Sequence, residues 1–593
     1  MHIRSARIHP NLPSVLSGIV AGLGLSLRAI RRGILISMEK CGSFHVEDDG
    51  VRDLKHECAI FLAYRRPGGA DPDASVLPLV LNGLKIQSNR GQEGFGLAVL
   101  NDVAGGKFEI LRSSRSVNDI SKLSDEEQAT MFAAFERNPI IGHNRYATHG
   151  PPDATNSQPM QNSLAGAKEL ALHKVIAFNG HIANADELRE GLEAVGYVLK
   201  GATDTEVLMQ LITKVAYELA EAGYTTDYAA IFSKVDAAID GACSLVLLDG
   251  AGDAVLYRHS NGIRPLELFE TDDGIIIAAS ETEAFVGLAG QHRTLNAGEI
   301  FHYSRARDSW SVSRVARANV HYCVMELLYF GRANSQYKGV SHYRIRRDIG
   351  ARMAETIRDR FEGISSYEKS KIRIIPVPNT AIPFALGIAN ALDLPYEMGI
   401  ERRENIRAFI NATHDRRLEI LQRKFAILRE AVAGKVVMIV DDTLIRRDTS
   451  ITITRMLRDA GAERVEWLIC APPFKGTCYY GIAVPSVDEL AYWSATKRLP
   501  KEIQERALRD EHVAEIEAEI ARDIGMDSLR FLPYEQLLKA LPGDKDQYCQ
   551  GCFRGIYPTP KGVERFTRSR DRFLGLLPVD AEPRPNRTIA DGI

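Results

Sequence analysis

The sequence predicts a protein of two parts, a β-rich first half and an α/β second half built on a parallel sheet. Its 593 residues, 45% of them hydrophobic, supply enough apolar side chains for two buried cores and a small third unit. Near Ala316, closely spaced strands give way to strands that alternate with amphipathic helices, the pattern of a parallel sheet. The clearest such unit, at residues 434–470, runs strand, polar loop, helix and strand.

The composition narrows the possible partners. A formal net charge of -3 gives no basic excess, so we expect no nucleic-acid or membrane partner and small-molecule substrates instead. Residues 12–36 are apolar but are interrupted by arginines, which argues against a membrane span; a signal peptide and a true start at Met38 are the alternatives there. Eight cysteines in so long a chain form no disulfide pattern, which favours a reducing, cytoplasmic location.

Cys58 precedes an apolar run, residues 59–63, that predicts a buried strand. A lone cysteine in this position is most often a core residue, because cysteine packs as a small apolar side chain. The alternative is a nucleophile at a mature N-terminus, whose α-amino group, with a pKa of about 8, acts as the base. That interpretation makes residues 1–57 an extension or propeptide that is removed.

Three polar segments downstream offer the residue types that such a nucleophile needs. Arg145, after an apolar strand, suits a bidentate grip on a carboxylate. Asn179-Gly180 is either a hairpin turn or an oxyanion hole made by a side-chain amide and a backbone N–H. Asp204, before a helical run, is either part of a helix cap or a partner for an ammonium group.

In order and spacing these segments resemble the class II glutamine amidotransferase family, as do residues 90–94, 261–266 and 280–282. The resemblance implies an α+β N-terminal-nucleophile hydrolase domain of four layers, αββα. It makes Cys58 the nucleophile, with Asn179 and Gly180 as the oxyanion hole. Arg145 and Asp204 would then bind the carboxylate and the amino group of glutamine.

Two features near Cys58 depart from that family. Ala59 stands where the family has glycine, which restricts the backbone. The α-amino group of Cys58 must also be released by cleavage after Glu57. Cys41, which is followed by glycine, is a rival nucleophile, but residues 43–49 are too polar for a buried first strand.

In the second half, Asp441 and Asp442 end a predicted strand, residues 436–440, ahead of a polar loop and a helix at 451–460. Parallel sheets bind ligands at the carboxyl ends of their strands, and a loop that enters a helix N-terminus suits a phosphate. An acidic pair that caps the helix is the alternative. Residues 440–450 resemble the loop of type I phosphoribosyltransferases, and more closely that of the amidophosphoribosyltransferase family, as do residues 376–380 and 406–410.

That resemblance implies an α/β type I phosphoribosyltransferase domain with a site for PRPP and Mg²⁺. Asp441 and Asp442 would hold the ribose hydroxyls, and the loop would surround the 5′-phosphate with Arg446, Thr449 and Ser450. Arg447 and Asp448 replace a glycine and a threonine of the family's loop. Two alternatives therefore stay open: a diverged amidotransferase with another ammonia acceptor, and a catalytically silent regulatory paralogue.

Four cysteines of the second half stand in contexts that the same family shares. A C-x-x-C pair alone suits half a zinc site or a redox pair, whereas four thiolates suit zinc or an iron–sulfur cluster. The resemblance to the family's iron–sulfur branch points to a [4Fe-4S] cluster that clamps the domain core to the C-terminal helices, with zinc as the alternative. The ligands are Cys323, Cys478, Cys549 and Cys552.

The resemblance predicts a domain plan and an activity. The expected parts are an extension (1–57), a glutamine amidotransferase domain (58–315), a phosphoribosyltransferase domain (316–500), C-terminal helices with the cysteine pair (501–565) and a disordered tail (566–593). The expected reaction converts PRPP and glutamine to 5-phosphoribosylamine, pyrophosphate and glutamate, the first step of purine synthesis. The resemblance also implies a homo-oligomer with purine nucleotides as effectors.

Overall fold

The computed structural model describes residues 58–71, 74–101, 106–145, 157–162, 169–224, 226–316, 319–403, 424–484 and 486–577, which belong to one compact unit. The predicted extension at 1–57 and the segment 406–410 lie outside these residues. None of the helices within them is both long enough and apolar enough to cross a membrane.

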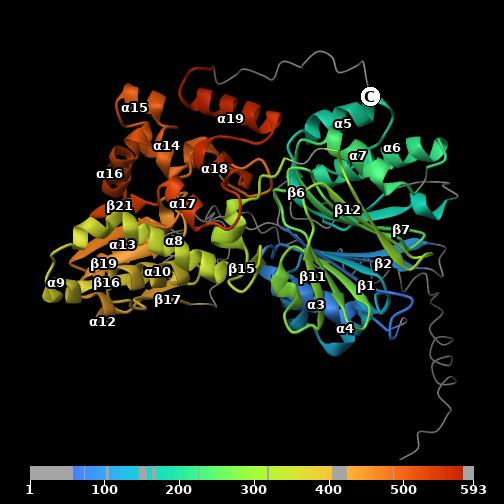
Figure 1. Cartoon of the computed structure of the whole chain (residues 1–593), viewed down its shortest axis with the longest axis horizontal. Helices are drawn as coiled ribbons and strands as arrows, with labels where there is room; N and C mark the ends of the chain where they lie inside the picture. Colours follow the sequence, from blue (N-terminus) through green and yellow to red (C-terminus); the bar gives the residue numbers. More distant parts are fainter. Residues whose placement is uncertain are drawn as a thin grey trace, which may run out of the picture. The chain divides into compact units, whose positions relative to one another are not determined.

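Two antiparallel sheets form the first half (Figure 1). The seven-stranded sheet has the order β11-β9-β10-β1-β4-β2-β3, and the six-stranded sheet the order β13-β12-β8-β7-β6-β5. The strands of the first are β1 (Ala59–Arg65), β2 (Phe95–Asn101), β3 (Lys107–Ser113), β4 (Ile140–Asn144), β9 (Glu267–Thr271), β10 (Ile275–Ala279) and β11 (Gly290–Thr294). Those of the second are β5 (Met160–Gln161), β6 (Lys174–Ile182), β7 (Gly241–Asp249), β8 (Ala254–Arg258), β12 (Glu299–Ser304) and β13 (Ser309–Arg314).

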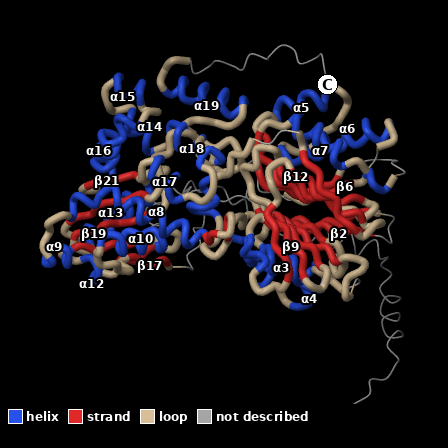
Figure 2. Tube along the Cα trace, viewed as in Figure 1, coloured by secondary structure: helices blue, strands red, loops and turns tan. Residues whose placement is uncertain are grey.

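Side chains along these strands alternate between the two faces of the sheet, and this alternation produces the layers. In β1, Ile60 and Leu62 pack between the two sheets, whereas Phe61 and Ala63 pack against the helix layer of the first sheet. That outer layer contains α3 (Leu77–Ile86) and α4 (Asp125–Phe132), and the second sheet is covered by α5 (Ala185–Ala194), α6 (Asp204–Glu221) and α7 (Tyr228–Ala238). Figure 2 shows the two sheets stacked between these helices. The predicted αββα arrangement is confirmed.

A parallel sheet, β16-β19-β20-β21, forms the centre of the second half. Its strands are β16 (Ile372–Pro376), β19 (Val436–Asp441), β20 (Arg464–Ile469) and β21 (Ser528–Phe531). The accompanying helices are α8 (His342–Ile357), α9 (Ser366–Lys371), α10 (Ile382–Leu392), α12 (Arg429–Val432), α13 (Asp448–Asp459) and α16 (Val513–Ile524). Two small ribbons complete it: β14 (Gln336–Tyr337) with β15 (Val340–Ser341), and β17 (Ile400–Arg402) with β18 (Phe425–Ile427).

The predicted strand–helix unit is present, but its helix begins earlier than predicted. α13 starts at Asp448, three residues before the expected Ile451, because the N–H of Ile451 already donates to the carbonyl of Arg447 (2.8 Å). An acidic residue in the first turn also favours a helix start at this point. The polar loop after Asp442 is therefore shorter than predicted.

The C-terminal helices are α14 (Ala491–Thr496), α15 (Lys501–Arg506), α17 (Tyr534–Ala540), α18 (Gly551–Arg554) and α19 (Pro560–Phe573). The prediction of a disordered tail from residue 566 is wrong as far as the end of α19. Thr559 caps this helix by accepting from the N–H of Gly562 (3.3 Å), Phe566 is buried, and the ring of Phe573 packs on Trp493. Its charged sequence forms the outer face of an amphipathic helix.

Candidate functional site

Cys58 lies at the start of β1 and is half-buried. Ala59 pairs with Asn144 of β4, so Cys58 and Arg145 are the next residues outward on two neighbouring strands. Ile60 faces the second sheet, and side chains two residues apart share a face of a strand, so the thiol lies on that face too. The structure thus brings Cys58 and Arg145 to one rim of the space between the sheets.

Asn179 approaches the same rim from the second sheet. It lies in β6 on the face of Val175 and Ala177, which pack between the sheets. Its Nδ2 donates to the Oγ of Ser280 (3.5 Å), and that Oγ also accepts from the N–H of Ile60 (3.0 Å). Ser280 therefore connects Asn179 to the backbone that follows Cys58.

Gly180 is next to Asn179 inside β6, so the hairpin-turn interpretation of this pair is wrong. Its φ is +150°, and a Cβ built at Gly180 would lie 1.9 Å from the carbonyl oxygen of Ala242 in β7. Only glycine fits there. The tight backbone packing fixes the plane of the Gly180 peptide, as a preorganised oxyanion donor requires.

Asp204 is the first residue of α6 and is held against the end of β6. Its Oδ2 accepts from the N–H of Ile182 (3.2 Å) and lies 2.9 Å from Nδ1 of His181. The helix cap itself is Thr203, whose side chain accepts from the N–H of Glu206 (3.3 Å). Asp204 is therefore not the cap residue. Its carboxylate contacts the two residues that directly follow the Asn179-Gly180 pair in β6.

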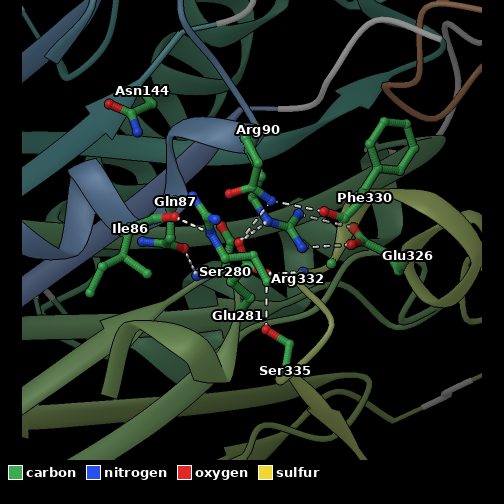
Figure 3. Close-up of polar contacts among 12 residues, drawn as sticks. Ile86, Gln87, Arg90, Asn144, Ser280, Glu281, Glu326, Phe330, Arg332 and Ser335 are labelled. Atoms are coloured by element: carbon green, nitrogen blue, oxygen red, sulfur yellow. Dashed lines mark hydrogen bonds and ion pairs between the residues drawn. The ribbon is translucent and has the colours of Figure 1, made fainter. Parts of the chain in front are cut away.

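Arg90, Glu281 and Glu326 form a buried ionic cluster (Figure 3). The Nη2 of Arg90 is 2.6 Å from Oε2 of Glu326, and its Nε is 3.3 Å from Oε1 of Glu281. Arg264 adds a second cation, with its Nη1 3.5 Å from Oε1 of Glu326. Burial alone would raise the pKa of Glu326, but the charges of Arg90 and Arg264 outweigh it and hold that pKa below its ordinary value.

The same cluster connects the first half to the segment after Glu326. Oε2 of Glu281 accepts from the N–H of Arg332 (2.9 Å) and from Oγ of Ser335 (3.0 Å). Asn89 donates through Nδ2 to the carbonyl of Phe330 (2.8 Å). The predicted turn at residues 90–94 is therefore also an anchor between the two halves of the chain.

Asp441 and Asp442 lie at the carboxyl end of β19, as predicted. Asp442 is buried and Asp441 is half-buried. The N–H of Asp442 donates to Oδ1 of Asp441 (2.9 Å), and Thr443 donates to Oδ1 of Asp442 (2.9 Å). Neither residue caps α13, whose first residue comes six positions after Asp442.

The rest of the predicted phosphate loop is braced by ion pairs. Arg446 donates to Oε1 of Glu489 (2.7 Å), and Arg447 pairs with Asp523 of α16. Thr449 and Ser450 form the first turn of α13, where Oγ of Ser450 donates to the carbonyl of Arg447 (2.9 Å). The structure brings all of these residues together with the acidic pair at one edge of the sheet.

The four predicted metal-binding cysteines converge from three segments. The N–H of Cys549 donates to the carbonyl of Tyr322 (2.9 Å), next to Cys323, and the N–H of Gly476 donates to the carbonyl of Cys552 (3.0 Å). Burial raises the pKa of Cys552 well above its ordinary value, and the other three thiols raise it further. Burial also raises the pKa of Cys323 to about 11, with smaller contributions from the charge of Glu326 and from the thiol of Cys478, while the charge of Arg264 opposes the rise. Cys323 is buried and the other three cysteines are half-buried, and their mutual effect on pKa shows that the four thiols lie near one another.

Neither the role of Ser280 nor the ionic cluster around Glu326 was predicted from the sequence. Ser280 follows an apolar strand inside a segment that resembles the family, which was the available signal. No local pattern pairs Arg90 with Glu326, because the two residues are 236 positions apart. Residues 146–150, which follow Arg145, lie outside the described part of the chain.

The fold and these residues define a glutamine amidotransferase domain joined to a phosphoribosyltransferase domain. A family model for the glutamine amidotransferase domain matches residues 143–287. The amidophosphoribosyltransferase of Methanothermobacter thermautotrophicus is 31% identical over 513 residues, which cover 86% of this chain and 96% of that protein. The chain belongs to the amidophosphoribosyltransferase family.

Two further relatives agree with this assignment. The amidophosphoribosyltransferase of Bacillus subtilis is 29% identical over 517 residues, 86% of this chain and 95% of its own length. The solved glutamine PRPP amidotransferase from B. subtilis, complexed with ADP and GMP, aligns with a TM-score of 0.68 and 27% identity over 85% of this chain and 98% of that one. The predicted fold, the enzyme class and glutamine-dependent amidotransfer to PRPP in purine biosynthesis are confirmed.

Proposed function

We propose that Cys58 releases ammonia from glutamine and that the ammonia attacks C1 of PRPP held at Asp441 and Asp442. The products are glutamate, pyrophosphate and 5-phosphoribosylamine. The observation that carries the proposal is Ser280, which accepts hydrogen bonds from both Asn179 and the backbone beside Cys58. One buried hydroxyl thereby fixes the spacing between the nucleophile's strand and the oxyanion donor.

In the glutaminase half, the α-amino group of Cys58 takes the proton of the thiol, and the thiolate attacks the side-chain carbonyl of glutamine. Asn179 Nδ2 and the Gly180 N–H donate to the developing oxyanion. Ammonia leaves with that proton, and water then hydrolyses the thioester to release glutamate. Arg145 and Asp204 orient the substrate through its carboxylate and its amino group.

In the transfer half, the acidic pair at the end of β19 binds the ribose hydroxyls of PRPP. The first turn of α13 provides Thr449 and Ser450 for the 5′-phosphate, where backbone N–H groups favour an anion. A Mg²⁺ ion would be held by PRPP and the oxygens of Asp441 and Asp442, and it would neutralise charge on the departing pyrophosphate.

The four cysteines are proposed to hold a [4Fe-4S] cluster. Their thiols lie near one another, and thiolates are the ligands of such clusters. Among the residues that the structure describes, no group of three or more His, Cys, Asp or Glu side chains is placed to hold a metal ion. Zinc is the alternative ion for four such thiolates.

The assembly, regulation and location of the enzyme are also proposals. A solved relative was complexed with ADP and GMP, which supports purine nucleotides as effectors of this chain. We expect a homo-oligomer in the cytoplasm. Its size is measured directly by light scattering with and without GMP.

The braced loop favours a second candidate function, transfer of ammonia to an acceptor other than PRPP. Arg446 and Arg447 already hold Glu489 and Asp523, and Asp448 adds a carboxylate where the family has a threonine. Each of these features weakens a phosphate site unless PRPP displaces the acidic partners.

The test is to incubate the cluster-loaded protein with glutamine, Mg²⁺ and PRPP while glutamate and pyrophosphate are followed together. Equal amounts of both products support the proposed reaction. Glutamate without PRPP-dependent pyrophosphate supports the second candidate, and neither product supports a silent paralogue. The Cys58→Ala variant should lose glutamine-dependent activity and keep activity with ammonium salts.

A separate measurement addresses the base. Mass spectrometry of the active protein should find Cys58 as its first residue. An enzyme that hydrolyses glutamine while it retains Glu57 would refute the role of the α-amino group.

A further inference from the structure

We propose that Gly481 is a positioning residue for the oxyanion hole, and that residues 476–482, here called the strap, hold the Gly180 peptide in place. This inference rests on the proposed role of Gly180 as an oxyanion donor. The strap belongs to the second half of the chain, between β20 and α14. It would make the glutaminase geometry depend on a segment that lies outside the glutamine amidotransferase domain.

The contact is one of backbone against backbone. A Cβ built on Gly481 would lie 3.0 Å from both the carbonyl carbon and the oxygen of Gly180, and 3.3 Å from its Cα. Those distances are shorter than ordinary van der Waals contact, so any side chain at 481 has to push the Cα and the carbonyl group of Gly180 away. Gly481 also has φ +105°, which L-residues rarely adopt.

Gly180 cannot yield on its other side. There the carbonyl of Ala242 would be 1.9 Å from a Cβ at Gly180, and β6 is paired with β7 over its whole length. Gly180 thus lies between a paired strand and the strap. The proposed donor N–H belongs to the Asn179–Gly180 peptide, which shares the Cα of Gly180 with this contact. A Cα that is held in place keeps that N–H aimed in one direction without rearrangement during the reaction, which is what an oxyanion donor needs.

The strap itself is fixed by buried polar contacts. Arg264, which is 1% exposed, donates through Nε (2.9 Å) and Nη2 (2.6 Å) to the carbonyl of Tyr480. The hydroxyl of Tyr480 is 3.0 Å from Oγ1 of Thr559, and Tyr557 donates to the carbonyl of Thr477 (2.6 Å). The residue immediately before Gly481 is therefore held from both the first half and the C-terminal helices.

The strap also carries one of the four cysteines. The N–H of Tyr480 donates to Sγ of Cys478 (3.3 Å), and Gly481 follows directly. Through these contacts the cysteine site and the oxyanion hole share one short segment. If the strap moved at Cys478, the movement would be transmitted to Gly180 along the strap itself. It would not pass through the core of either sheet.

The test compares Gly481→Ala with Gly525→Ala. Gly525 ends α16 with φ +84°, and nothing lies within 4 Å of a Cβ built there, so its substitution brings similar backbone strain without the contact. For Gly481→Ala we expect the kcat of glutamine hydrolysis to fall about tenfold or more, with the KM for glutamine within about twofold, since an oxyanion donor acts mainly in the transition state.

Two further measurements separate positioning from general damage. Activity with PRPP and ammonium, and the thermal unfolding midpoint, should match between the two variants. An aldehyde analogue of glutamine, to which the Cys58 thiol adds so that the carbonyl oxygen becomes the hydroxyl of a thiohemiacetal, should bind Gly481→Ala about tenfold more weakly.

Equal glutaminase kcat in the two variants would overturn the inference. So would a parallel loss of glutamine-dependent and ammonium-dependent activity in Gly481→Ala, which would mean that the substitution damages the whole enzyme. If the wild-type protein hydrolyses no glutamine, the proposed function fails and the inference fails with it, and this outcome is distinct from the other two.

Discussion

At the scale of single residues, a buried hydroxyl connects the two sheets beside the proposed glutamine site. Ser280 is fully buried and accepts from Ile60 and Asn179, on strands of two different sheets. The hydroxyl accepts a hydrogen bond from the buried backbone N–H of Ile60, and it also fixes the orientation of the Asn179 amide. A serine hydroxyl has no special reactivity, so the role of Ser280 follows from its position between strands of the two sheets.

We expect Ser280→Ala to lower the kcat of glutamine hydrolysis by about tenfold, because the Asn179 amide loses the partner that orients it. The buried N–H of Ile60 is also left without its acceptor, which costs about 1–3 kcal/mol of stability. Steady-state kinetics with glutamine and a thermal melt measure the two effects. Unchanged kcat in a stable variant would show that Asn179 needs no support from Ser280.

Glu326 is the residue whose loss should cost the most stability. Glu326→Gln leaves Arg90 and Arg264 buried without their shared anion, and we expect a loss of about 3 kcal/mol at pH 7. The folded-state pKa of Glu326 is held below its unfolded value, so its stabilisation is present above about pH 4.3 and is lost as the pH falls through the folded pKa.

The stability gap between wild type and Glu326→Gln should therefore narrow in acid. Urea unfolding at pH 7 and at pH 4 measures this gap. A gap of constant size would mean that Glu326 contributes through its shape and hydrogen bonds and not through its charge.

The sequence predicts such residues unequally. Cys58, Asn179 and Asp441 lie beside apolar strands in short motifs, so a local pattern marks them. Arg90 and Glu326 meet only because two distant segments pack together, and no spacing rule connects residues that far apart. Local chemistry was predictable, whereas partners that depend on the tertiary fold were not.

At the scale of elements, boundaries were harder to predict than the elements themselves. The strand that became β19 was predicted to within one residue, because its apolar run ends at a carboxylate. α13 and α19 were misjudged where charged residues form the exposed face of a helix. Charge in a sequence does not distinguish a solvated helix face from a loop, and only capping and burial decide.

The packing of α16 against β21 leads to a prediction that depends on pH. Glu517 of α16 is buried, and burial raises its pKa to about 7, although it accepts from the N–H of Phe531 (2.7 Å). A carboxyl whose pKa is higher in the folded state destabilises the fold as the pH rises from about 4.3 towards 7. Glu517→Gln removes that charge and keeps an acceptor for Phe531.

We therefore expect Glu517→Gln to be more stable than wild type by about 1–2 kcal/mol at pH 8, and the advantage to shrink towards pH 5. The loss of the partly exposed ion pair with Arg530 offsets only a fraction of this gain. Thermal melts across this pH range provide the measurement. A variant that is less stable than wild type at pH 8 would contradict the assignment of a buried, ionised carboxylate.

At the scale of the whole molecule, the cysteines and the ionic cluster connect parts of the chain that are far apart in sequence. Cys323 precedes Glu326 by three residues, and its N–H donates to the carbonyl of Ile263 (3.1 Å) in the first half. Arg264 directly follows Ile263, and its guanidinium contacts both Glu326 and the carbonyl of Tyr480. A short stretch of chain thus connects the residues proposed to bind glutamine, the buried ionic cluster and the four cysteines.

In the proposed function the four cysteines would clamp the C-terminal helices through a shared cluster, and removal of one cysteine should be visible as a local loss of structure. We expect Cys552→Ser to lack iron and to unfold first at residues 545–575, because α18 and α19 lose their bond to the strap and to Cys323. Cys470→Ala is the control, since Cys470 is a buried cysteine outside the set of four. Iron analysis and hydrogen exchange of both variants measure the outcome. Full protection of α19 in an iron-free Cys552→Ser protein would show that packing alone holds these helices, and that the cysteines serve another purpose.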